Sequence, residues 1–558
     1  MTATPWGFRD ILPEEAQARE EIALTVKGCF REHHYLPVET PLLEDKGSLE
    51  EGGRIADTPF KLFDDDGRLL VVRPDNTLPI VRLVSTRMRA ADLPLRLRYE
   101  APVVRECQRN AGGSRQFTQL GFELIGVGDT AGDVEIVSLV AEAVRKLALP
   151  DARIIAGSVR PFKELLAACE DRELAAEALR CVHANDFVGL DARVAASVES
   201  EAVKAAISEL PRLHGGAEVL DRVDTLLAAA GIVAPLTREL RALVEGLAPE
   251  EAQVLSFDFS IMNSFDYYTG LVFKAYAGGL PDPVGSGGRY DSIFTGAFGD
   301  GIEVPAAGFA FSLERLEAAR TSAVGRGAEG PLRIAVPKGS LKADTLDVLE
   351  AAGLDVSELR DPGRHLIVRG RDTRAGEGAV GDIEFVIVRP SDAPAFVGCG
   401  GADCGICGWD SLIEADLNLL QLVDLGYGLC TFIEAEPARR AGQAERNYAR
   451  RGSLRVATKY PRIASAWYAE RGVNADIVSL HGNIELGPIV GMTDRIVDIT
   501  ATGATLRDND LVITGRIMDC TARFFVNPGA ARLDPRVRNL ADRLAAAVKD
   551  KHFEPAAG

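Results

Sequence analysis

Apolar and polar positions alternate in two different ways along this 558-residue chain. From residue 332 onward, short apolar runs of strand length recur between segments with helical spacing. The strand candidates are 332–336, 383–388, 475–480, 495–499 and 511–517. Strands that alternate with helices are typical of α/β domains, so this part of the chain predicts an α/β architecture with mainly parallel pairing.

The end of the chain has the pattern of an amphipathic helix that begins near Asp534. Asp534 is a suitable cap, and Pro535 fits the first helical turn because it needs no hydrogen-bonded amide. A stripe of apolar residues follows at helical spacing. It consists of Val537, Leu540, Leu544 and Val548.

The first part of the chain mixes both patterns. Residues 160–250 are rich in Ala and Leu at helical spacing, and strand-like runs return at 254–259 and 270–277. A small, Gly-bearing stretch without apolar periodicity covers 318–331, as is typical of a linker. We therefore expect an N-terminal region, 1–318, with a helical insertion at about 150–250. A linker at 319–331 and a C-terminal region at 332–558 follow it.

Composition narrows the class of protein. The net charge of −19 argues against a large nonspecific nucleic-acid surface, which requires clustered Lys and Arg. The N-terminus has no basic segment followed by an apolar run, and no stretch approaches 18 apolar residues. The nine cysteines are scattered, which is typical of reduced thiols. We expect a cytoplasmic protein with no membrane partner.

The segment from Glu485 to Leu506 has the most informative chemistry. A strand candidate, Arg495 to Ile499, carries Asp498 near its end, and the sequence ATGAT follows at 501–505. Such a loop can turn backbone N–H groups and two hydroxyls towards a phosphate, while the carboxylate can accept hydrogen bonds from ribose. An ordinary Thr/Gly-rich turn between a strand and a helix explains the pattern about equally well.

The whole segment, however, resembles the signature of the ATP phosphoribosyltransferase family. The matching residues are Glu485, Gly491, Ile496, Asp498, Thr502, Gly503, Thr505 and Leu506. Thr493 and Ala501 depart from the usual pattern. The resemblance continues, in family order, through LRIAVPKGSL (332–341), IVRPSDAPAFV (387–397), GADCGICGWDSLIE (401–414), DLGYG (424–428), RVATKYP (455–461) and IMDCTARFFVN (517–527).

This resemblance implies a reaction between two polyanions, in which N1 of the adenine of ATP attacks C1 of phosphoribosyl pyrophosphate and pyrophosphate leaves. Cations and Mg²⁺ would stabilise the growing negative charge. The expected catalytic cations are Lys338, Arg389, Arg455 and Lys459. The expected phosphoribosyl pyrophosphate site consists of Glu485, Asp498, Ala501, Thr502, Gly503, Ala504 and Thr505. Ser340 replaces the Arg of the family's PKGRL turn, and nearby Arg364 is a candidate substitute.

Three cysteines have the spacing of an iron–sulfur site. Cys399, Cys404 and Cys407 follow a C-x4-C-x2-C pattern, and Cys430 is a conceivable fourth ligand. In the resembling family small and aliphatic residues occupy this stretch, and Cys packs as a small hydrophobe. We therefore interpret the trio as packing residues and predict no metal site.

Residues 1–318 resemble the class II aminoacyl-tRNA synthetases, specifically histidyl-tRNA synthetase. The matching motifs are GFRDILPEEA (7–16), RPDNTLPIVR (73–82), a strand pair (98–123), FDYYTGLVF (265–273), GGRYD (287–291) and GFAFSLERL (308–316). The resemblance implies a histidine pocket. Its residues would be Asp75, Thr77, Arg105, Gln119, Glu123, Tyr267 and Tyr268.

The departures from the synthetase pattern fall on groups that handle ATP. Asn263 stands where the synthetases carry an Arg, Cys107 where they carry a Glu, and Ser312 where they carry a Gly, while QRN (108–110) replaces the usual RPQ-type loop. Adenylate formation requires cations on the α-phosphate, so these changes argue against aminoacylation. The pattern is similar to the synthetase-like regulatory subunit of ATP phosphoribosyltransferase.

The two resemblances together imply a class II synthetase-like antiparallel sheet core followed by a two-lobed α/β transferase similar to periplasmic binding proteins. The catalytic part has the length of the short form, which depends on a synthetase-like partner that is here fused to it. Histidine is the expected effector, tRNA is not an expected partner, and a homo-oligomer is expected. Two alternatives stay open: a working histidyl-tRNA synthetase fused to a transferase, and a nonenzymatic small-molecule sensor.

Overall fold

The computed structural model describes residues 4–51, 60–88, 92–106, 113–261, 268–294, 304–321, 330–376, 378–500 and 503–550. The chain divides into two compact units. Unit 1 comprises residues 1–330 and 528–534, and unit 2 comprises 331–527 and 535–558. No helix in these ranges is both long and apolar enough to cross a membrane.

Unit 1 is built on one large, mainly antiparallel sheet, which contains nine strands in the described part of the chain. Their spatial order is β1-β5-β6-β12-β11-β10-β7-β9-β8, and only β1/β5 and β7/β9 pair in parallel among them. The bounds are β1 Leu36–Pro37, β5 Leu95–Val104, β6 Gln116–Ile125, β7 Arg153–Ser158, β8 His214–Gly215, β9 Leu255–Asp258, β10 Leu271–Tyr276, β11 Gly285–Arg289 and β12 Ala306–Ser312.

Alternate residues of β6 face opposite sides of this sheet, as strand geometry requires. Phe122 faces helix α1 (Pro13–Glu32), and its ring lies 5.1 Å from Phe30 and 5.2 Å from Tyr35 between centroids. Helices α4 (Asp129–Lys146) and α12 (Leu313–Thr321) pack with α1. Glu123 points to the other side, where α3 (Thr77–Arg87) contributes to the core.

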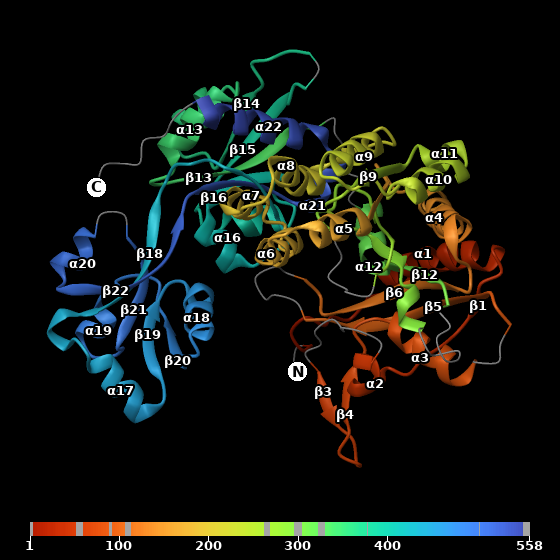
Figure 1. Cartoon of the computed structure of the whole chain (residues 1–558), viewed down its shortest axis with the longest axis horizontal. Helices are drawn as coiled ribbons and strands as arrows, with labels where there is room; N and C mark the ends of the chain where they lie inside the picture. Colours follow the sequence, from red (N-terminus) through yellow and green to blue (C-terminus); the bar gives the residue numbers. More distant parts are fainter. Residues whose placement is uncertain are drawn as a thin grey trace. The chain divides into compact units, whose positions relative to one another are not determined.

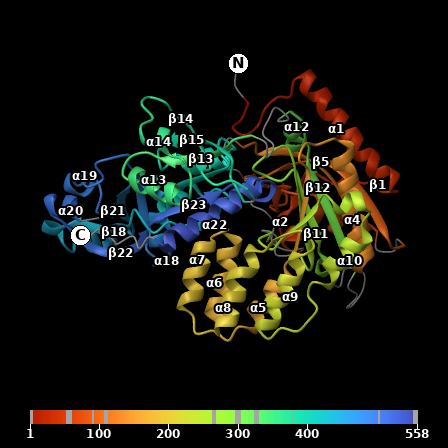
Figure 2. The same cartoon turned by 90° about the horizontal axis from the view of Figure 1, so that it is seen from above.

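Two smaller assemblies complete unit 1. Strands β2 (Leu43–Asp45), β4 (Leu69–Val72) and β3 (Lys61–Phe63) form a small antiparallel sheet beside α2 (Lys46–Glu51). The predicted helical insertion consists of short helices that gather in one cluster (Figure 2). They are α5 (Arg160–Ala168), α6 (Arg172–His183), α7 (Phe187–Ala196), α8 (Glu201–Glu209) and α9 (Val219–Ala229), and α10 (Arg238–Gly246) and α11 (Pro249–Ala252) follow.

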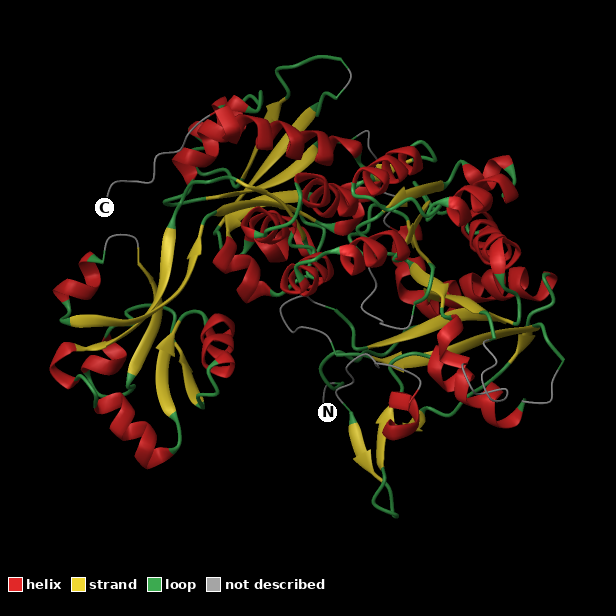
Figure 3. Ribbon diagram, viewed as in Figure 1, coloured by secondary structure: helices red, strands yellow, loops and turns green. Residues whose placement is uncertain are grey.

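Unit 2 has two lobes, each a sheet with helices on its faces (Figure 3). Lobe 1 has the strand order β14-β15-β13-β16-β23-β17 and lobe 2 the order β20-β19-β21-β18-β22. The lobe 1 strands are β13 Leu332–Pro337, β14 Ile367–Arg371, β15 Asp382–Val388, β16 Cys404–Gly408, β17 Leu420–Asp424 and β23 Ala522–Val526. Those of lobe 2 are β18 Cys430–Pro437, β19 Leu454–Thr458, β20 Ala475–Ser479, β21 Arg495–Thr500 and β22 Leu511–Cys520.

The expectation of mainly parallel pairing is wrong. β13 pairs in parallel with β15 and β16, and β19 pairs in parallel with β20 and β21, but the other pairs in both sheets are antiparallel. For every antiparallel pair except β14/β15, the reason is the path of the chain. It leaves lobe 1 after β17 and returns after β22, so β18, β22 and β23 belong to crossings between lobes and not to βαβ units.

Helices cover both faces of each lobe. In lobe 1, α13 (Lys342–Ala351) packs on α22 (Pro535–Asp550), and α15 (Ala393–Gly398) and α16 (Trp409–Ala415) share a core with the sheet. A short helix, α14 (Ser357–Arg360), contacts β14. Lobe 2 carries α17 (Gln443–Arg451) and α18 (Pro461–Glu470) on one core, and α19 (Leu486–Ile489) and α20 (Ala504–Asp508) flank the other.

One segment late in the chain belongs to unit 1, whereas we expected 332–558 to form one continuous region. It is α21 (Pro528–Leu533), which lies between β23 and α22 in sequence. Arg532 forms an ion pair with Asp258 at 3.1 Å, and both side chains are at most 4% exposed. A Cβ at Gly529 would lie 2.0 Å from the carbonyl oxygen of Leu280, so only glycine permits this close approach.

Candidate functional site

A cluster of buried polar side chains lies between β6 and the start of α3 in unit 1. Its centre is Glu123, which is 1% exposed. The hydroxyls of Thr77 and Tyr99 donate hydrogen bonds to Oε1 of Glu123, at 3.0 and 3.4 Å, and the hydroxyl of Tyr290 donates to Oε2. Gly121 leaves room for Tyr99, because a Cβ there would lie 2.3 Å from its ring.

A second group of hydrogen bonds extends this cluster to the N-terminus of α3. The Oε1 atom of Gln119 accepts from the backbone N–H of Asn76 at 3.1 Å and from its Nδ2 at 2.8 Å. Arg105 donates from Nε to the carbonyl oxygen of Pro74 at 2.7 Å. Asp75 is buried beside these groups. The loop before α3 therefore brings side chains from three elements into one buried polar cluster, which is the predicted wall of a histidine pocket.

The charges in this wall suit an amphoteric ligand. Burial raises the pKa of Asp75, and the charge of Arg105 opposes that rise. Burial also raises the pKa of Glu123 to about 7, while the hydroxyl donors around it act in the opposite direction. The two buried carboxyl groups can accept hydrogen bonds from an ammonium group or a ring N–H, and the guanidinium can attract a carboxylate.

The structure thus brings together five of the seven residues expected to bind histidine: Asp75, Thr77, Arg105, Gln119 and Glu123. Tyr268 is buried in the adjoining apolar cluster with Tyr99 and Tyr290, and Tyr267 lies outside the described residues. Sequence reasoning missed Asn76, Tyr99 and Tyr290. Tyr290 lies in the GGRYD motif, so its motif was recognised without the role of its hydroxyl.

The raised pKa of Glu123 predicts a pH-dependent stability. Between the unfolded value near 4.5 and the folded value of about 7, the folded chain holds a proton that the unfolded chain releases. The stabilisation is complete below the lower value and is lost as the pH rises through about 7. Relative to Glu123→Gln, the parent protein should lose up to about 3 kcal/mol of unfolding free energy from pH 5 to pH 8. If the unfolding free energies of the two proteins, measured by denaturation, change equally with pH, the prediction is wrong.

In unit 2, two of the expected catalytic cations lie together at the carboxyl ends of the parallel strands of lobe 1. Lys338 follows β13, and its backbone N–H donates to the carbonyl oxygen of Val388 at 2.9 Å, next to Arg389. Both cations are exposed. Arg364 lies at the same edge, because β14 begins opposite the end of β15. Ser340 is also exposed there, and Arg364 stays a candidate substitute for the missing Arg.

Lobe 2 gathers three more of the expected residues at the carboxyl ends of β19 and β21. These strands run in parallel, with Thr458 opposite Val497. Lys459, which follows β19, therefore lies beside Asp498, which is still part of β21 and pairs with Ile433 of β18. Burial raises the pKa of Asp498 to about 6; nearby Glu485 acts in the same direction and Lys459 in the opposite one. An acidic group and a cation therefore lie within electrostatic range at this edge, as the substrate chemistry requires.

The expected phosphate loop follows β21. The backbone N–H of Gly503 donates to the Thr500 hydroxyl at 2.9 Å, and Gly503 has a φ of 69°, a conformation that favours glycine. Ala504 and Thr505 begin the short helix α20. Ala501 and Thr502 lie outside the described residues.

Arg455 is not brought to this edge. It lies near the amino end of β19, where its backbone N–H donates to Asp494 at 2.9 Å. Lys459 is four residues further along, at the other end of the strand. The position of Arg455 therefore gives no support to the expectation that its side chain contacts the leaving group.

Asp410 was missed by sequence reasoning and belongs to the same neighbourhood. It lies at the start of α16 in lobe 1. Burial raises its pKa, and its neighbours include Lys459 of lobe 2, whose charge opposes that rise. Asp410 is part of the motif GICGWDSLIE, which the sequence analysis recognised. Only the fold, however, places this acid of lobe 1 near a cation of lobe 2.

The cysteine trio is divided between a strand and the end of a helix. Cys404 and Cys407 are buried on β16, and their odd separation places them on opposite faces; Cys399 is exposed after α15. In the described ranges no three or more His, Cys, Asp or Glu side chains gather closely enough to hold a metal ion. Cys407 packs in the core that α15 and α16 share with the sheet.

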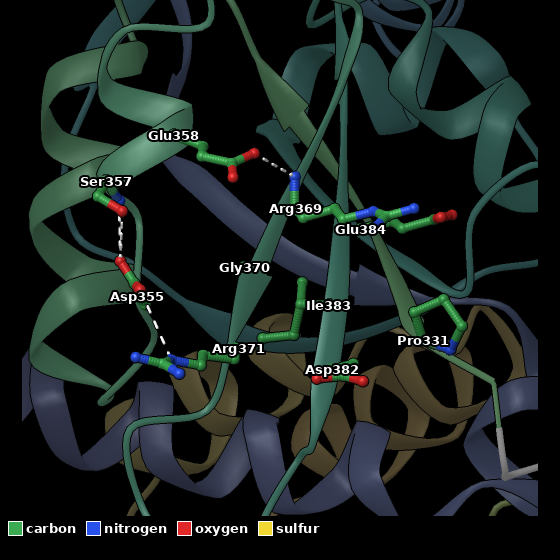
Figure 4. A pocket seen from close by; sticks show the side chains of 10 residues that line it. All are labelled: Pro331, Asp355, Ser357, Glu358, Arg369, Gly370, Arg371, Asp382, Ile383 and Glu384. Carbon is green, nitrogen blue, oxygen red and sulfur yellow. Dashed lines mark hydrogen bonds and ion pairs between the residues drawn. The ribbon is translucent and has the colours of Figure 1, made fainter.

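A cavity of about 630 Å³ opens elsewhere on lobe 1 (Figure 4). Asp382 and Pro331 mark the amino ends of β15 and β13 there, so this cavity is at the opposite edge of the sheet from Lys338 and Arg389. Two of its acidic groups already have partners: Asp355 accepts from the Ser357 hydroxyl at 2.7 Å, and Glu384 pairs with Arg333 at 2.8 Å. We assign no substrate to it.

The comparisons with known proteins match two regions of the chain. The sequence model of the histidyl-tRNA synthetase family matches residues 7–316, and that of the ATP phosphoribosyltransferase family matches residues 389–546. An ATP phosphoribosyltransferase of Rubrobacter xylanophilus is 48% identical over 202 residues, 36% of this chain and 89% of that protein. An ATP phosphoribosyltransferase regulatory subunit of Moorella thermoacetica is 36% identical over 385 residues, 67% of this chain and 94% of that protein.

A solved structure supports the fold of the first region. It is described as an ATP phosphoribosyltransferase regulatory subunit/histidyl-tRNA synthetase from Bacillus halodurans, and it matches with a TM-score of 0.53 and 28% identity over 63% of this chain and 90% of that one. The two family models match separate stretches of the chain, and the chain covers most of the length of both the regulatory and the catalytic relative. The chain therefore belongs to the ATP phosphoribosyltransferase family and joins, in one polypeptide, a region of the histidyl-tRNA synthetase type to a catalytic transferase region.

Proposed function

We propose that this chain is a self-contained, histidine-regulated ATP phosphoribosyltransferase that acts at the first step of histidine biosynthesis. Unit 2 joins N1 of the adenine of ATP to C1 of phosphoribosyl pyrophosphate, and the buried pocket of unit 1 binds histidine. The observation that carries the transferase assignment is the convergence of Lys459, Asp498 and Glu485 at one edge of lobe 2. The protein is expected in the cytoplasm, as a homo-oligomer.

The chemistry follows from charge. Asp498 would accept hydrogen bonds from ribose hydroxyls, and the loop at 501–505 would receive the 5′-phosphate through its N–H groups and hydroxyls. Pyrophosphate gains negative charge as it leaves, so Lys338, Arg389 and Lys459 would stabilise the transition state more than the ground state. No base is needed, because adenine N1 attacks with its own lone pair.

The residues present also fit Mg²⁺. This ion is commonly held by one or two carboxylates, several waters and substrate phosphates, so an all-protein cage is not required. Asp498 and Glu485 are neighbouring oxygen donors at the substrate edge. They are the residues that would hold the ion, which would neutralise part of the pyrophosphate charge when bound.

The pocket of unit 1 supports histidine as the effector. An amino acid with an imidazole ring presents an ammonium, a carboxylate and a ring N–H. The wall offers two buried carboxyl groups, one guanidinium and the amide of Gln119 for these groups. The direct test of the whole proposal is pyrophosphate release from ATP and phosphoribosyl pyrophosphate with Mg²⁺, measured with and without histidine. Absence of turnover would overturn it.

Thr505→Ala tests the phosphate loop. Loss of one charge-assisted hydrogen bond of about 1.5–3 kcal/mol should raise the KM for phosphoribosyl pyrophosphate by roughly 10- to 100-fold. The KM for ATP should change much less. Thr373→Ala is the control, because its hydroxyl donates only to the carbonyl oxygen of Gly353, away from the loop. Equal kinetics for Thr505→Ala and the parent protein would remove the loop from the site.

The synthetase-like region should not charge tRNA with histidine. The positions that depart from the synthetase pattern include Asn263 and Cys107, both of which lie outside the described residues. Without a cation on the α-phosphate, adenylate formation loses a main source of transition-state stabilisation. Incorporation of labelled histidine into tRNA is the measurement, with an authentic histidyl-tRNA synthetase as the positive control. Incorporation above the no-enzyme background would refute the prediction.

A further inference from the structure

Two cysteines face each other where the chain crosses between the lobes of unit 2. The first crossing, residues 425–429, leads from β17 into β18, and the second, Thr521, leads from β22 back into β23. Cys430 is the first residue of β18, and Cys520 is the last residue of β22. The two residues are direct partners in the antiparallel register, which continues without a bulge through Phe432 and Met518. Figure 1 shows these two long strands running together.

The crossings themselves are tied together. The backbone N–H of Leu425 donates to the carbonyl oxygen of Ala522, and that of Ala522 donates to the carbonyl oxygen of Tyr427, both at 2.9 Å. The region also carries contacts between lobes. Glu414 of α16, for example, accepts from the backbone N–H of Ile463 at the start of α18 at 2.8 Å. Two connecting segments of this kind form the hinge on which a two-lobed protein opens and closes around its ligand.

The pairing has the geometry that a disulfide requires. Directly opposite residues in an antiparallel pair have Cα atoms about 4.5–5.5 Å apart, within the range of about 4.4–6.8 Å that disulfides span. Both side chains project to the same face of the sheet and belong to one apolar cluster with Phe432 and Tyr460. Both are free thiols; Cys520 is buried and Cys430 is partly exposed, so a small reagent can reach one of them.

We propose that Cys430 and Cys520 form a reversible redox pair that a peroxide converts to a disulfide, locking the hinge of the transferase. The sulfur of Cys430 attacks one oxygen of hydrogen peroxide, the O–O bond breaks, and a sulfenic acid and water result. The thiol of Cys520 then displaces the hydroxyl group as a second water. Two thiols lose two electrons and two protons, and one peroxide is reduced to two waters. A small thiol reverses the reaction by exchange.

The electrostatics of the pair favour this order of events. A hydrogen bond between the two thiols lowers the pKa of Cys430 and raises that of Cys520. The thiolate is the nucleophile towards peroxide, so the partly exposed Cys430 reacts first and the buried Cys520 resolves it. In contrast, burial raises the pKa of Cys407 well above its usual range, which leaves that thiol unreactive.

The experiment uses the full-length protein, hydrogen peroxide and a dithiol reductant. After oxidation, the intact mass should fall by two hydrogen atoms, and peptide mapping should find Cys430 linked to Cys520. Oxidation should lower kcat for pyrophosphate release at least about fivefold, and the reductant should restore it. Cys399→Ser should behave like the parent protein, because Cys399 is exposed and lies after α15. Cys520→Ser should stay unlinked, trap the sulfenic acid of Cys430 for labelling by dimedone, and resist locking.

Different results overturn different parts of the proposal. Linkage of other cysteines, or labelling of both thiols by an alkylating agent after peroxide treatment, shows that the pair does not form the disulfide. A correctly linked protein with unchanged kcat shows that the link does not act on the hinge. The kinetic arm rests on the proposed transferase function, whereas the mass arm does not. A protein that is inactive before oxidation therefore counts against that function and leaves the linkage result standing.

Discussion

Replacing Glu123 with glutamine is expected to abolish histidine inhibition and to leave the uninhibited transferase rate within about twofold of the parent value. Among the described acids, only Glu123 accepts hydrogen bonds from all three hydroxyls, those of Thr77, Tyr99 and Tyr290. Glutamine would turn an N–H₂ group towards these donors. Loss of a charged partner worth about 2–3 kcal/mol should raise the histidine concentration for half-inhibition roughly 30- to 100-fold. Initial rates of pyrophosphate release over a histidine series measure this.

A second variant and a control make this result specific. Tyr268→Phe removes one hydroxyl from the buried cluster beside the pocket and should weaken inhibition without loss of activity. Glu32→Gln removes an acid of unit 1 whose side chain is 59% exposed and pairs with Lys146, so it should leave inhibition unchanged. Calorimetry should show the same order for histidine binding. If Glu123→Gln and Tyr268→Phe both keep the parent inhibition curve, histidine binds elsewhere and the pocket only braces the sheet.

Replacing Arg495 with alanine is expected to destabilise lobe 2 by about 3–5 kcal/mol, because two buried carboxylates lose their counter-charge. Arg495 starts β21, and its guanidinium pairs with Glu434 and Glu436 at 3.1 Å each and also with Glu445. The side chains of Glu434 and Glu436 are only 7% exposed. Asp498 lies on the same strand, so the variant should also lose transferase activity.

Hydrogen exchange measured by mass spectrometry localises this effect, since faster exchange should appear in peptides from 430–520 and not in unit 1. Arg439→Ala is the matched control. Arg439 pairs with Asp510 at 2.8 Å, but these side chains are 85% and 62% exposed, so its loss should change stability by less than about 1 kcal/mol. Equal protection in Arg495→Ala and Arg439→Ala would show that burial of the acids does not set the stability of this lobe.

Local pattern was sufficient for much of the fold. The apolar runs at 332–336, 383–388 and 495–499 are strands β13, β15 and β21, each extended by one residue. The final stripe is a helix in which Val537, Leu540 and Leu544 are fully buried. These elements were predictable because burial of one face imposes a period of two on strands and of 3.6 on helices, whatever the partner.

The candidate sites were predictable only in part. Motifs located Glu123, Thr77 and Gln119 in unit 1 and Lys459 and Asp498 in unit 2, because each motif carries its functional residue within a few positions of a glycine or a strand end. They did not locate Tyr290 or Asp410, which reach their sites from distant elements. They also gave no reason to separate Arg455 from Lys459. A spacing of four residues does not by itself show that the two lie at opposite ends of one strand.

The sequence by itself determined several strands and the last helix, the family of each region and most of the residues of the buried polar cluster in unit 1, because these depend on short-range periodicity and on motifs. Tertiary structure alone decided the strand directions of unit 2, the return of Arg532 to unit 1 and the pairing of Cys430 with Cys520. Those features join residues that are far apart in the chain. Their stabilisation comes from burial of charge and apolar surface that only the folded arrangement creates.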